Sequence, residues 1–392
     1  MEVQYNFDQV VNRRQQQSKK WTAYQHFGVP VSDEILPLWI ADMDFKCEPR
    51  IRQALQGVID YGIYGYDAPA DDFFSSFIDW QEQRNHWHVS SNCLVPVSGV
   101  VPGICNAIRS LTQAGDRILI QTPVYYPFFK AIETNQRCLV ENPLIRKADQ
   151  YVIDFADFEE KIKTCKMFIL CSPHNPVGRV WRVDELQKMA ELCLKHGVII
   201  VADEIHSDLI FKGYKHTPLA SLSSAIDQQT ITLMAPSKSF NVAGLTQSVA
   251  IIANPEIRQR FEEGLCSSGF MHMNSFAAAG FPAAYRYGGD WLDQALTYIE
   301  ANVDYVLDYL TKRLPEVDAH RPEGTFLMWL DFTEVSRDPE VLMRRLIHQG
   351  KIIIEDGSIF GQQGRGFCRF NIASPRSIIE EAMSRIETAI HS

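Results

Sequence analysis

The sequence of 392 residues has no run of about 18 consecutive apolar residues, so it offers no candidate membrane-spanning helix. Its first residues lack a basic start followed by an apolar stretch, and we therefore expect no secretory signal. Basic residues are outnumbered: Lys and Arg total 38 against 48 Asp and Glu, which gives a formal net charge of -10. An acidic surface repels phosphate backbones, so we do not expect nucleic acid to be a partner.

The cysteines have no C-x-x-C spacing, which excludes a zinc ribbon. There are nine of them, and an odd number in a chain of this length argues against a disulfide framework. Free thiols are typical of the reducing cytoplasm, which is the location we expect. His86 and His88 form a close pair without accompanying ligands, so we expect no bound metal.

What the sequence does contain is enough apolar material for a large core. Hydrophobic residues make up 46% and charged residues 22%, which are ordinary values for a globular protein and exclude a disordered or fibrous chain. The length indicates two or three domains. No internal repeat and no low-complexity linker separates them.

Short apolar runs alternate with helical patterns along the middle of the chain. Apolar strands separated by helices indicate an α/β protein with a mostly parallel central sheet and helices on both faces. The spacing predicts a long helical stretch over 275–314, and the tail from residue 321 is typical of a smaller α+β domain. The predicted strands are 117–120, 166–171, 197–202 and 230–234, and the predicted helices 71–83, 102–113 and 183–196.

Polar side chains follow three of these strands. Asn175 comes after the second, Asp203 and His206 after the third, and Lys238 after the fourth. Ligands of open α/β sheets bind at the carboxyl ends of the strands, so we expect these side chains to meet in one site.

Each of these residue types suits one cofactor. A lysine after a buried strand is placed to form a Schiff base with an aldehyde, and its ordinary alternative is a surface lysine. A buried Asp203 needs a partner, which the pyridinium nitrogen of pyridoxal 5'-phosphate (PLP) would provide, although a helix cap or an ion pair would also satisfy it. Asn175 could contact the phenolic oxygen of PLP, or it could be a turn residue before Pro176.

Together these segments resemble a known family. The ordered set Asn-Pro-x-Gly at 175–178, Asp-x-x-His at 203–206 and Ser-Lys at 237–238 resembles the PLP-dependent class I/II aminotransferase superfamily, with the fold type I PLP-dependent transferase fold, over almost the whole chain. The sequence is similar to the MalY/PatB-type cystathionine β-lyase (C–S lyase) branch in residues 36–45, in His206 where most relatives have Tyr, and in 237–241. The resemblance implies an N-terminal arm and part of the small domain over 1–50, a large PLP-binding domain over 51–285 and a small C-terminal domain over 286–392.

The resemblance also implies roles for single residues. Lys238 would hold PLP covalently, and Asp203 would keep its ring nitrogen protonated. Tyr66 would act in catalysis from the neighbouring subunit, so a homodimer is implied. Arg369 would grip the substrate α-carboxylate with its planar fork. The implied cofactor contacts are Lys238, Asp203, His206, Asn175, Tyr125, Gly99, Val100, Val101, Ser237 and Tyr66, and the implied substrate contacts are Arg369, Asn175, Ala41 and Tyr125.

Two positions depart from the superfamily pattern. Many members carry Ser three residues before the lysine and Arg eight residues after it, where this sequence has Ala235 and Thr246. We therefore expect phosphate binding to depend more on backbone amides at the start of the helix after Gly99, on Ser237 and on Tyr66.

The reaction implied by the resemblance is α,β-elimination. Lys238 would remove the Cα proton, a thiolate would leave Cβ, and cystathionine would yield homocysteine, pyruvate and ammonia, a step of methionine biosynthesis and sulfur amino acid metabolism. Transamination uses the same residues and stays open, as does a non-catalytic regulator built on the same fold. The sequence does not choose among cystathionine, cystine, cysteine and S-alkyl cysteines, and we expect selectivity to depend on walls that include Trp39, Met271 and Tyr125.

Overall fold

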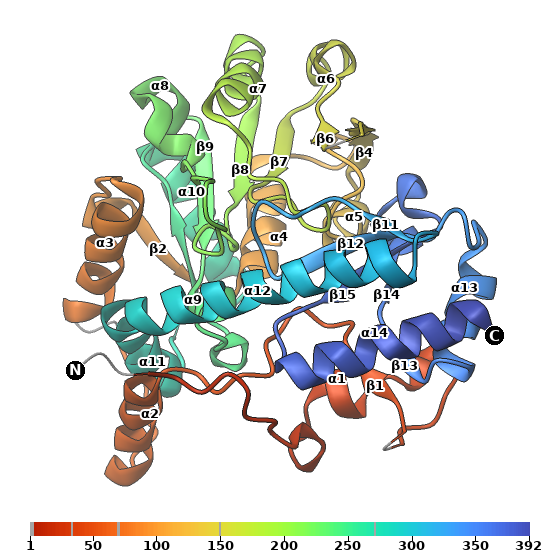
Figure 1. Ribbon diagram of the computed structural model, residues 1–392. Helices are drawn as coiled ribbons and strands as arrows, with labels where there is room; N and C mark the ends of the chain where they lie inside the picture. The colour runs from red at the N-terminus through yellow and green to blue at the C-terminus, as the bar shows by residue number, and fades with distance from the viewer. Residues whose placement is uncertain (1–3, 33, 69–70, 149, 270–271) are drawn as a thin grey trace.

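A seven-stranded sheet lies at the centre of the larger part of the molecule (Figure 1). The computed structural model describes residues 4–32, 34–68, 71–148, 150–269 and 272–392. Six strands of the sheet run parallel and only β10 runs antiparallel to its neighbours, so the prediction of a mostly parallel sheet is confirmed. In spatial order the strands are β2 (Leu94–Val97), β10 (Ser248–Ile251), β9 (Thr230–Met234), β8 (Ile199–Asp203), β7 (Met167–Cys171), β3 (Arg117–Ile120) and β4 (Cys138–Glu141).

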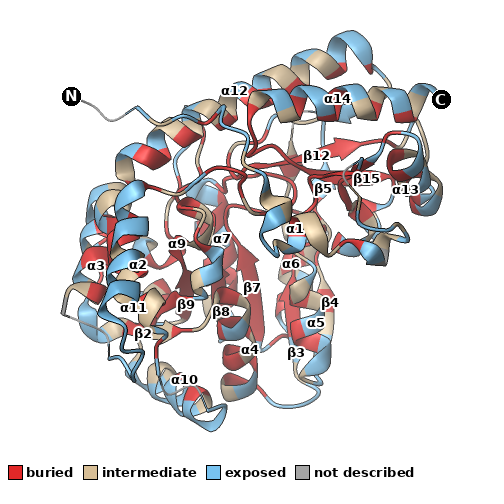
Figure 2. Ribbon diagram, turned by 90° about the horizontal axis from the view of Figure 1, so that it is seen from below, coloured by how far each residue is buried: buried red, intermediate tan, exposed pale blue. Residues whose placement is uncertain are grey.

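Helices cover both faces of this sheet because successive strand residues point to opposite sides. Leu119 and Phe168 pack on one side with α6 and α7, whereas Ile118 and Met167 pack on the other with α4, α5 and α10. The inner strands β7 and β9 are buried throughout, whereas the edge strand β4 is partly exposed, and Figure 2 shows the sheet inside a shell of helices with exposed outer faces. The helices are α4 (Val100–Leu111), α5 (Pro127–Thr134), α6 (Phe155–Ile162), α7 (Val183–Lys195) and α10 (Pro255–Ser267).

The sequence-based element bounds hold to within two residues, apart from one long helix. The stretch predicted over 275–314 is two helices, α11 (Ser275–Tyr287) and α12 (Gly289–Arg313). The chain changes direction at Gly288, whose ψ of -8° departs from the helical value. A Cβ atom at Gly288 would overlap the Phe240 ring, so this close packing requires glycine. The hydrophobic periodicity of the sequence does not predict a helix break at a single residue.

A second, four-stranded antiparallel sheet lies beside the first, in the C-terminal part of the chain (Figure 1). It packs with α12, α13 (Pro339–His348) and α14 (Arg376–His391). This α+β part agrees with the predicted smaller unit, whereas the boundaries at residues 50 and 285 remain predictions. Its strands are β11 (Asp318–Ala319), β12 (Leu327–Asp331), β15 (Phe367–Asn371) and β14 (Glu355–Asp356).

The N-terminal arm packs against this C-terminal part. Strand β1 (Leu36–Pro37) pairs in parallel with β13 (Ile352–Ile353), and α1 (Lys19–Thr22) lies close by (Figure 1). Within the described ranges, no helix is long and apolar enough to cross a membrane. The remaining helices and strands are α2 (Pro49–Tyr61), α3 (Asp71–Asn85), α8 (Ser224–Asp227), α9 (Pro236–Ser239), β5 (Ile145–Arg146) and β6 (Tyr151–Val152).

Candidate active site

The carboxyl ends of five parallel strands surround a cavity of about 230 Å³. Most of the residues predicted for the site line it, and they come from segments that are far apart in the sequence. The predicted residues in its wall are Ala41, Gly99, Val100, Val101, Tyr125, Asn175, Asp203, His206, Ser237 and Lys238. Their roles stay predictions, but the expectation that one sheet edge brings them together is confirmed.

Lys238 reaches the cavity from α9, the short helical turn that follows β9. Its Nζ donates a hydrogen bond to the carbonyl of Ala41. Its removal from bulk water and the positive charge of Arg369 lower the pKa of Lys238 to about 8. A fraction of this amine is therefore neutral near pH 8 and able to accept a proton or attack a carbonyl carbon.

Asp203 is the last residue of β8, whereas the sequence predicts that it is the first residue after that strand. It is 3% exposed. The backbone N–H of Ile205 donates to its Oδ1 at 3.2 Å, and no cation in the described chain forms an ion pair with it. Burial raises the pKa of Asp203 to about 7. A buried carboxylate without a cationic partner fits a protonated ring nitrogen of a ligand.

His206 is also buried, and its Nδ1 has no hydrogen-bond partner within the described chain. Burial and the nearby positive charge of Lys238 hold the pKa of His206 well below its usual value, so the ring is neutral. Asn175 follows β7, and its backbone N–H donates to the sulfur of Cys171 at 3.4 Å. Together with Tyr125, these side chains give the cavity polar atoms and an aromatic wall for a planar polar ring.

The N-terminus of α4 forms the end of the cavity where an anion could bind. Gly99 precedes the helix with φ at +146°, a conformation that side chains disfavour, and its carbonyl accepts the amide of Gly103 at 3.0 Å. The free amides of the first turn, at Val100 and Val101, carry the positive end of the helix dipole. Thr246 lies in the same wall.

Arg369 is 2% exposed and does not line the cavity, but it touches a residue that does. Its Nη1 donates to Asn175 Oδ1 at 3.3 Å, and its Nη2 donates to the carbonyl of Trp39 at 2.9 Å. The guanidinium also lies over the ring of Phe360, 4.9 Å from its centroid. Glu355 Oε2 is 3.5 Å from Nη2.

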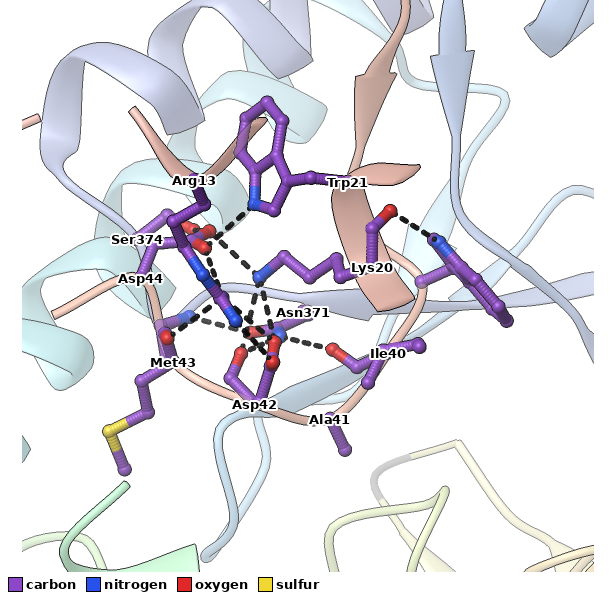
Figure 3. A network of polar contacts seen from close by, with 12 residues as sticks. Arg13, Lys20, Trp21, Ile40, Ala41, Asp42, Met43, Asp44, Asn371 and Ser374 are labelled. Carbon is purple, nitrogen blue, oxygen red and sulfur yellow. Dashed lines mark hydrogen bonds and ion pairs between the residues drawn. The ribbon is translucent and has the colours of Figure 1, made fainter. Parts of the chain in front are cut away.

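A segment of the N-terminal arm, residues 39–45, joins the two cationic groups of the site, because Ala41 accepts from Lys238 and Trp39 accepts from Arg369. We call residues 39–45 the N-terminal strip. Figure 3 shows the polar network that holds it. Asn371 Nδ2 donates to the carbonyl of Ile40 at 2.6 Å. The strip is thereby fixed to β15, the strand that carries Arg369.

Two cations outside the strip, Arg13 and Lys20, anchor it through two of its own carboxylates, Asp42 and Asp44 (Figure 3). Arg13 lies 2.7 Å from both Asp42 and Asp44, and Lys20 lies 2.7 Å from Asp44 and 3.3 Å from Asp42. Two positive and two negative charges thus balance in a site where Lys20 is fully buried. Their desolvation is tolerated because every charge has an opposite partner.

Sequence reasoning missed several residues that support the site. Asn241, three positions after Lys238, donates to the carbonyl of Met43 in the N-terminal strip at 3.0 Å. Asp208 accepts from Ser239 at 2.6 Å. Asn241 belongs to a segment that carried the family resemblance and Asp208 lies two residues beyond another, but only their contacts assign them a role.

Tyr66 does not reach the cavity of its own chain. It is 87% exposed, and its ring centroid is 4.5 Å from that of His272. Its role in a neighbouring subunit stays a prediction. Met271, expected in the wall, lies outside the described residues, and Trp39 is 4% exposed and directs its carbonyl to Arg369. In the described ranges, no group of three His, Cys, Asp or Glu residues could hold a metal ion.

The family model for aminotransferase class I and II matches residues 68–386. The chain belongs to this family. It is 40% identical to cystathionine beta-lyase PatB of Bacillus subtilis (strain 168), covering 98% of this chain and 100% of that protein. It is 33% identical to the protein MalY of Escherichia coli (strain K12), covering 99% of each chain.

Two solved structures of PLP-containing proteins share the fold. Cystalysin from Treponema denticola, which contains a pyridoxal 5'-phosphate cofactor, superposes with a TM-score of 0.96 at 37% identity over 99% of each chain. The PLP-bound C–S lyase from Staphylococcus hominis superposes with a TM-score of 0.92 at 30% identity, over 100% of this chain and 99% of that one. The predicted fold type I architecture is thereby confirmed.

Proposed function

We propose that this protein is a PLP-dependent carbon–sulfur β-lyase that cleaves L-cystathionine and related S-substituted cysteines. The observation that carries the proposal is the meeting in one cavity of Lys238, neutral His206 and buried Asp203, which has no ion-pair partner in the part of the chain that the structure describes. Full-length similarity to PatB at 40% identity supports the same reaction class. Cystathionine as the preferred substrate, and a role in methionine biosynthesis, are parts of this proposal.

The residues present fit PLP. Among the residues that the structure describes, the buried Asp203 carboxylate has no cation paired with it and His206 Nδ1 has no hydrogen-bond partner, and the first turn of α4 offers amides to a phosphate. Lys238 would hold the cofactor aldehyde through its Nζ. When bound, PLP supplies an electron sink that stabilises negative charge at the substrate Cα.

The chain's own residues supply the proton transfer and the orientation. Arg369 binds the α-carboxylate, and Asn175, bonded to Arg369, lies between it and the cavity. When its Nζ is not bonded to the cofactor, Lys238, with its pKa lowered to about 8, would take the proton from Cα, and the carbonyl of Ala41 would orient its Nζ. The Cβ–S bond then breaks and sulfur leaves with its electron pair. With water, the products are the thiol, pyruvate and ammonia.

The proposal includes a homodimer with shared sites. The segment around α2 and the loop after it exposes several large apolar side chains, an arrangement typical of interaction surfaces. The exposed side chains are Ile59 (49%), Tyr61 (74%), Ile63 (68%), Tyr64 (60%) and Tyr66 (87%). Sedimentation should give a dimer, and Tyr66→Ala should weaken PLP binding while the dimer persists. A cytoplasmic location is supported by nine free cysteines.

The decisive experiment is pyruvate release from L-cystathionine by the PLP-loaded protein with no added keto acid. We expect pyruvate and free thiol over many turnovers, because elimination regenerates the cofactor. A single turnover that only an added keto acid restores would replace the lyase with an aminotransferase. Absence of both activities, with S-methylcysteine also inert, would favour a non-catalytic regulator.

A further inference from the structure

Glu355 lies directly against the arginine that is proposed to bind the substrate carboxylate. It pairs with Arg369 across the two neighbouring strands β14 and β15, and its Oε2 is 3.5 Å from Nη2. Both side chains are almost completely buried. The proposed binding site for the substrate carboxylate therefore already contains an anionic side chain, Glu355. The elimination reaction gives this side chain no role.

The hydrogens of Arg369 Nη2 decide whether the guanidinium can bind a carboxylate through two hydrogen bonds. A guanidinium grips a carboxylate with two parallel N–H groups, either Nε with Nη2 or Nη1 with Nη2. Both arrangements use a hydrogen of Nη2, and in this site its hydrogens face the carbonyl of Trp39 and the carboxylate of Glu355. Nε has no partner within the described chain. The Glu355 contact is the longer of the two, so it is the one that a substrate displaces.

We propose that Glu355 competes with the substrate α-carboxylate for Arg369, so that the amino acid binds together with a proton taken up by Glu355. This specificity-determining role of Glu355 rests on the proposed function, in which Arg369 binds that carboxylate. Two adjacent anions on one guanidinium repel each other, whereas a protonated Glu355 leaves Arg369 free to pair with the ligand. Glu355 thereby makes affinity for carboxylate ligands fall as the pH rises.

The surroundings of Glu355 set the pH range of this effect. Burial raises its pKa to about 7, although the Arg369 charge opposes the shift. Above this pH the side chain is ionised and competes, and below it the side chain is neutral. The ionisable groups that act on it or feel its charge are Arg369 and Cys368 on β15, Asp356 on β14, Lys19 on α1, and Tyr125 and Tyr126 before α5.

The test measures binding rather than turnover and uses 3-(methylthio)propionate, a carboxylate without an amino group. Its dissociation constant for the PLP-loaded protein is measured by calorimetry between pH 6 and 9, in buffers of different ionisation enthalpy, which count protons taken up. We expect wild type to lose about tenfold in affinity for each pH unit above 7 and to take up about one proton per ligand. Glu355→Gln should bind with no pH dependence, take up no proton, and exceed wild type about tenfold or more at pH 8.5.

Matched variants separate the outcomes. Asp356→Asn, on the same strand, should keep the loss of affinity with rising pH and the proton uptake, but at lower pH, because the charge of Asp356 raises the pKa of Glu355. Glu355→Met should repeat the Glu355→Gln profile, which guards against a folding defect in one variant. A pH-dependent Glu355→Gln, weaker binding by it at every pH, or a probe that binds neither protein would overturn the proposal. Arg369→Lys tests the underlying function: if it binds the probe as tightly as wild type, the proposed carboxylate site itself is wrong.

Discussion

Asp208 Oδ2 accepts a hydrogen bond of 2.6 Å from the hydroxyl of Ser239, the residue that follows the proposed catalytic Lys238. Asp208 also accepts the indole N–H of Trp80 at 2.9 Å, and it is buried. The loop after β8, which carries Asp203, is thereby tied to the helical turn that carries the lysine. The position of Asp203 relative to Lys238 therefore depends on the buried carboxylate of Asp208.

Ser239→Ala should destabilise the protein and slow its turnover. Removing one donor to buried Asp208 costs roughly 1–3 kcal/mol of unfolding free energy, and it loosens the turn that holds Lys238. We expect kcat to fall while KM changes little, measured beside a urea unfolding curve. Ser267→Ala is the control, because Ser267 is exposed and bonds only within its own helix. An unchanged kcat for Ser239→Ala would show that the bond does not position the lysine.

Lys238→Ala should abolish both turnover and the absorbance of covalently held PLP. The variant loses the amine that attaches the cofactor and accepts the Cα proton. Absorbance spectra and pyruvate release measure the two effects separately. Lys212→Ala, at an exposed lysine, should retain both. Full lyase activity in Lys238→Ala would make the assignment of this lysine wrong.

Asp203→Asn should stabilise the PLP-free protein at alkaline pH while it abolishes turnover of the loaded enzyme. Folding raises the pKa of Asp203 from 3.8 to about 7, so the folded state holds the extra proton in this range and loses stability as the pH rises through it. The penalty is complete above about pH 7 and is on the order of 4 kcal/mol.

The measurement is thermal or urea unfolding of the PLP-free proteins at pH 4 and pH 8. We expect the variant to be more stable than wild type at pH 8 and similar at pH 4. Asp60→Asn, at an exposed carboxylate, should show no such difference. Equal stabilities of Asp203→Asn and wild type at pH 8 would mean that Asp203 has a compensating partner.

Lys20→Met should destabilise the protein by about 3–5 kcal/mol, because Asp44 would keep its buried charge with one cation fewer. Urea unfolding measures the loss. Lys19→Met, at the exposed neighbour, should cost little. Because the N-terminal strip contacts Lys238 through Ala41, the variant should also slow turnover. A stability equal to wild type would contradict the assigned role of the four-charge cluster.

Local patterns in the sequence predicted much of this fold. Strands such as 230–234 are buried on both faces, so they read as unbroken apolar runs, and the residue types directly after them predicted where Asn175, Asp203 and Lys238 converge. The break at Gly288 was not predictable, because it depends on Phe240, which lies 48 positions earlier in the sequence.

The sequence by itself determined four of the seven central strands, their alternation with helices, and the chemical types at their carboxyl ends, because these follow from local periodicity and from residues adjacent to a strand end. Strands β2, β4 and β10 were not predicted. Only the tertiary structure decided which groups support the side chains at those carboxyl ends. Glu355 against Arg369, Asp208 against Ser239 and Lys20 against Asp44 are contacts between separate elements. Such pairs carry no local pattern, and their energies arise from burial, which exists only once the chain has folded.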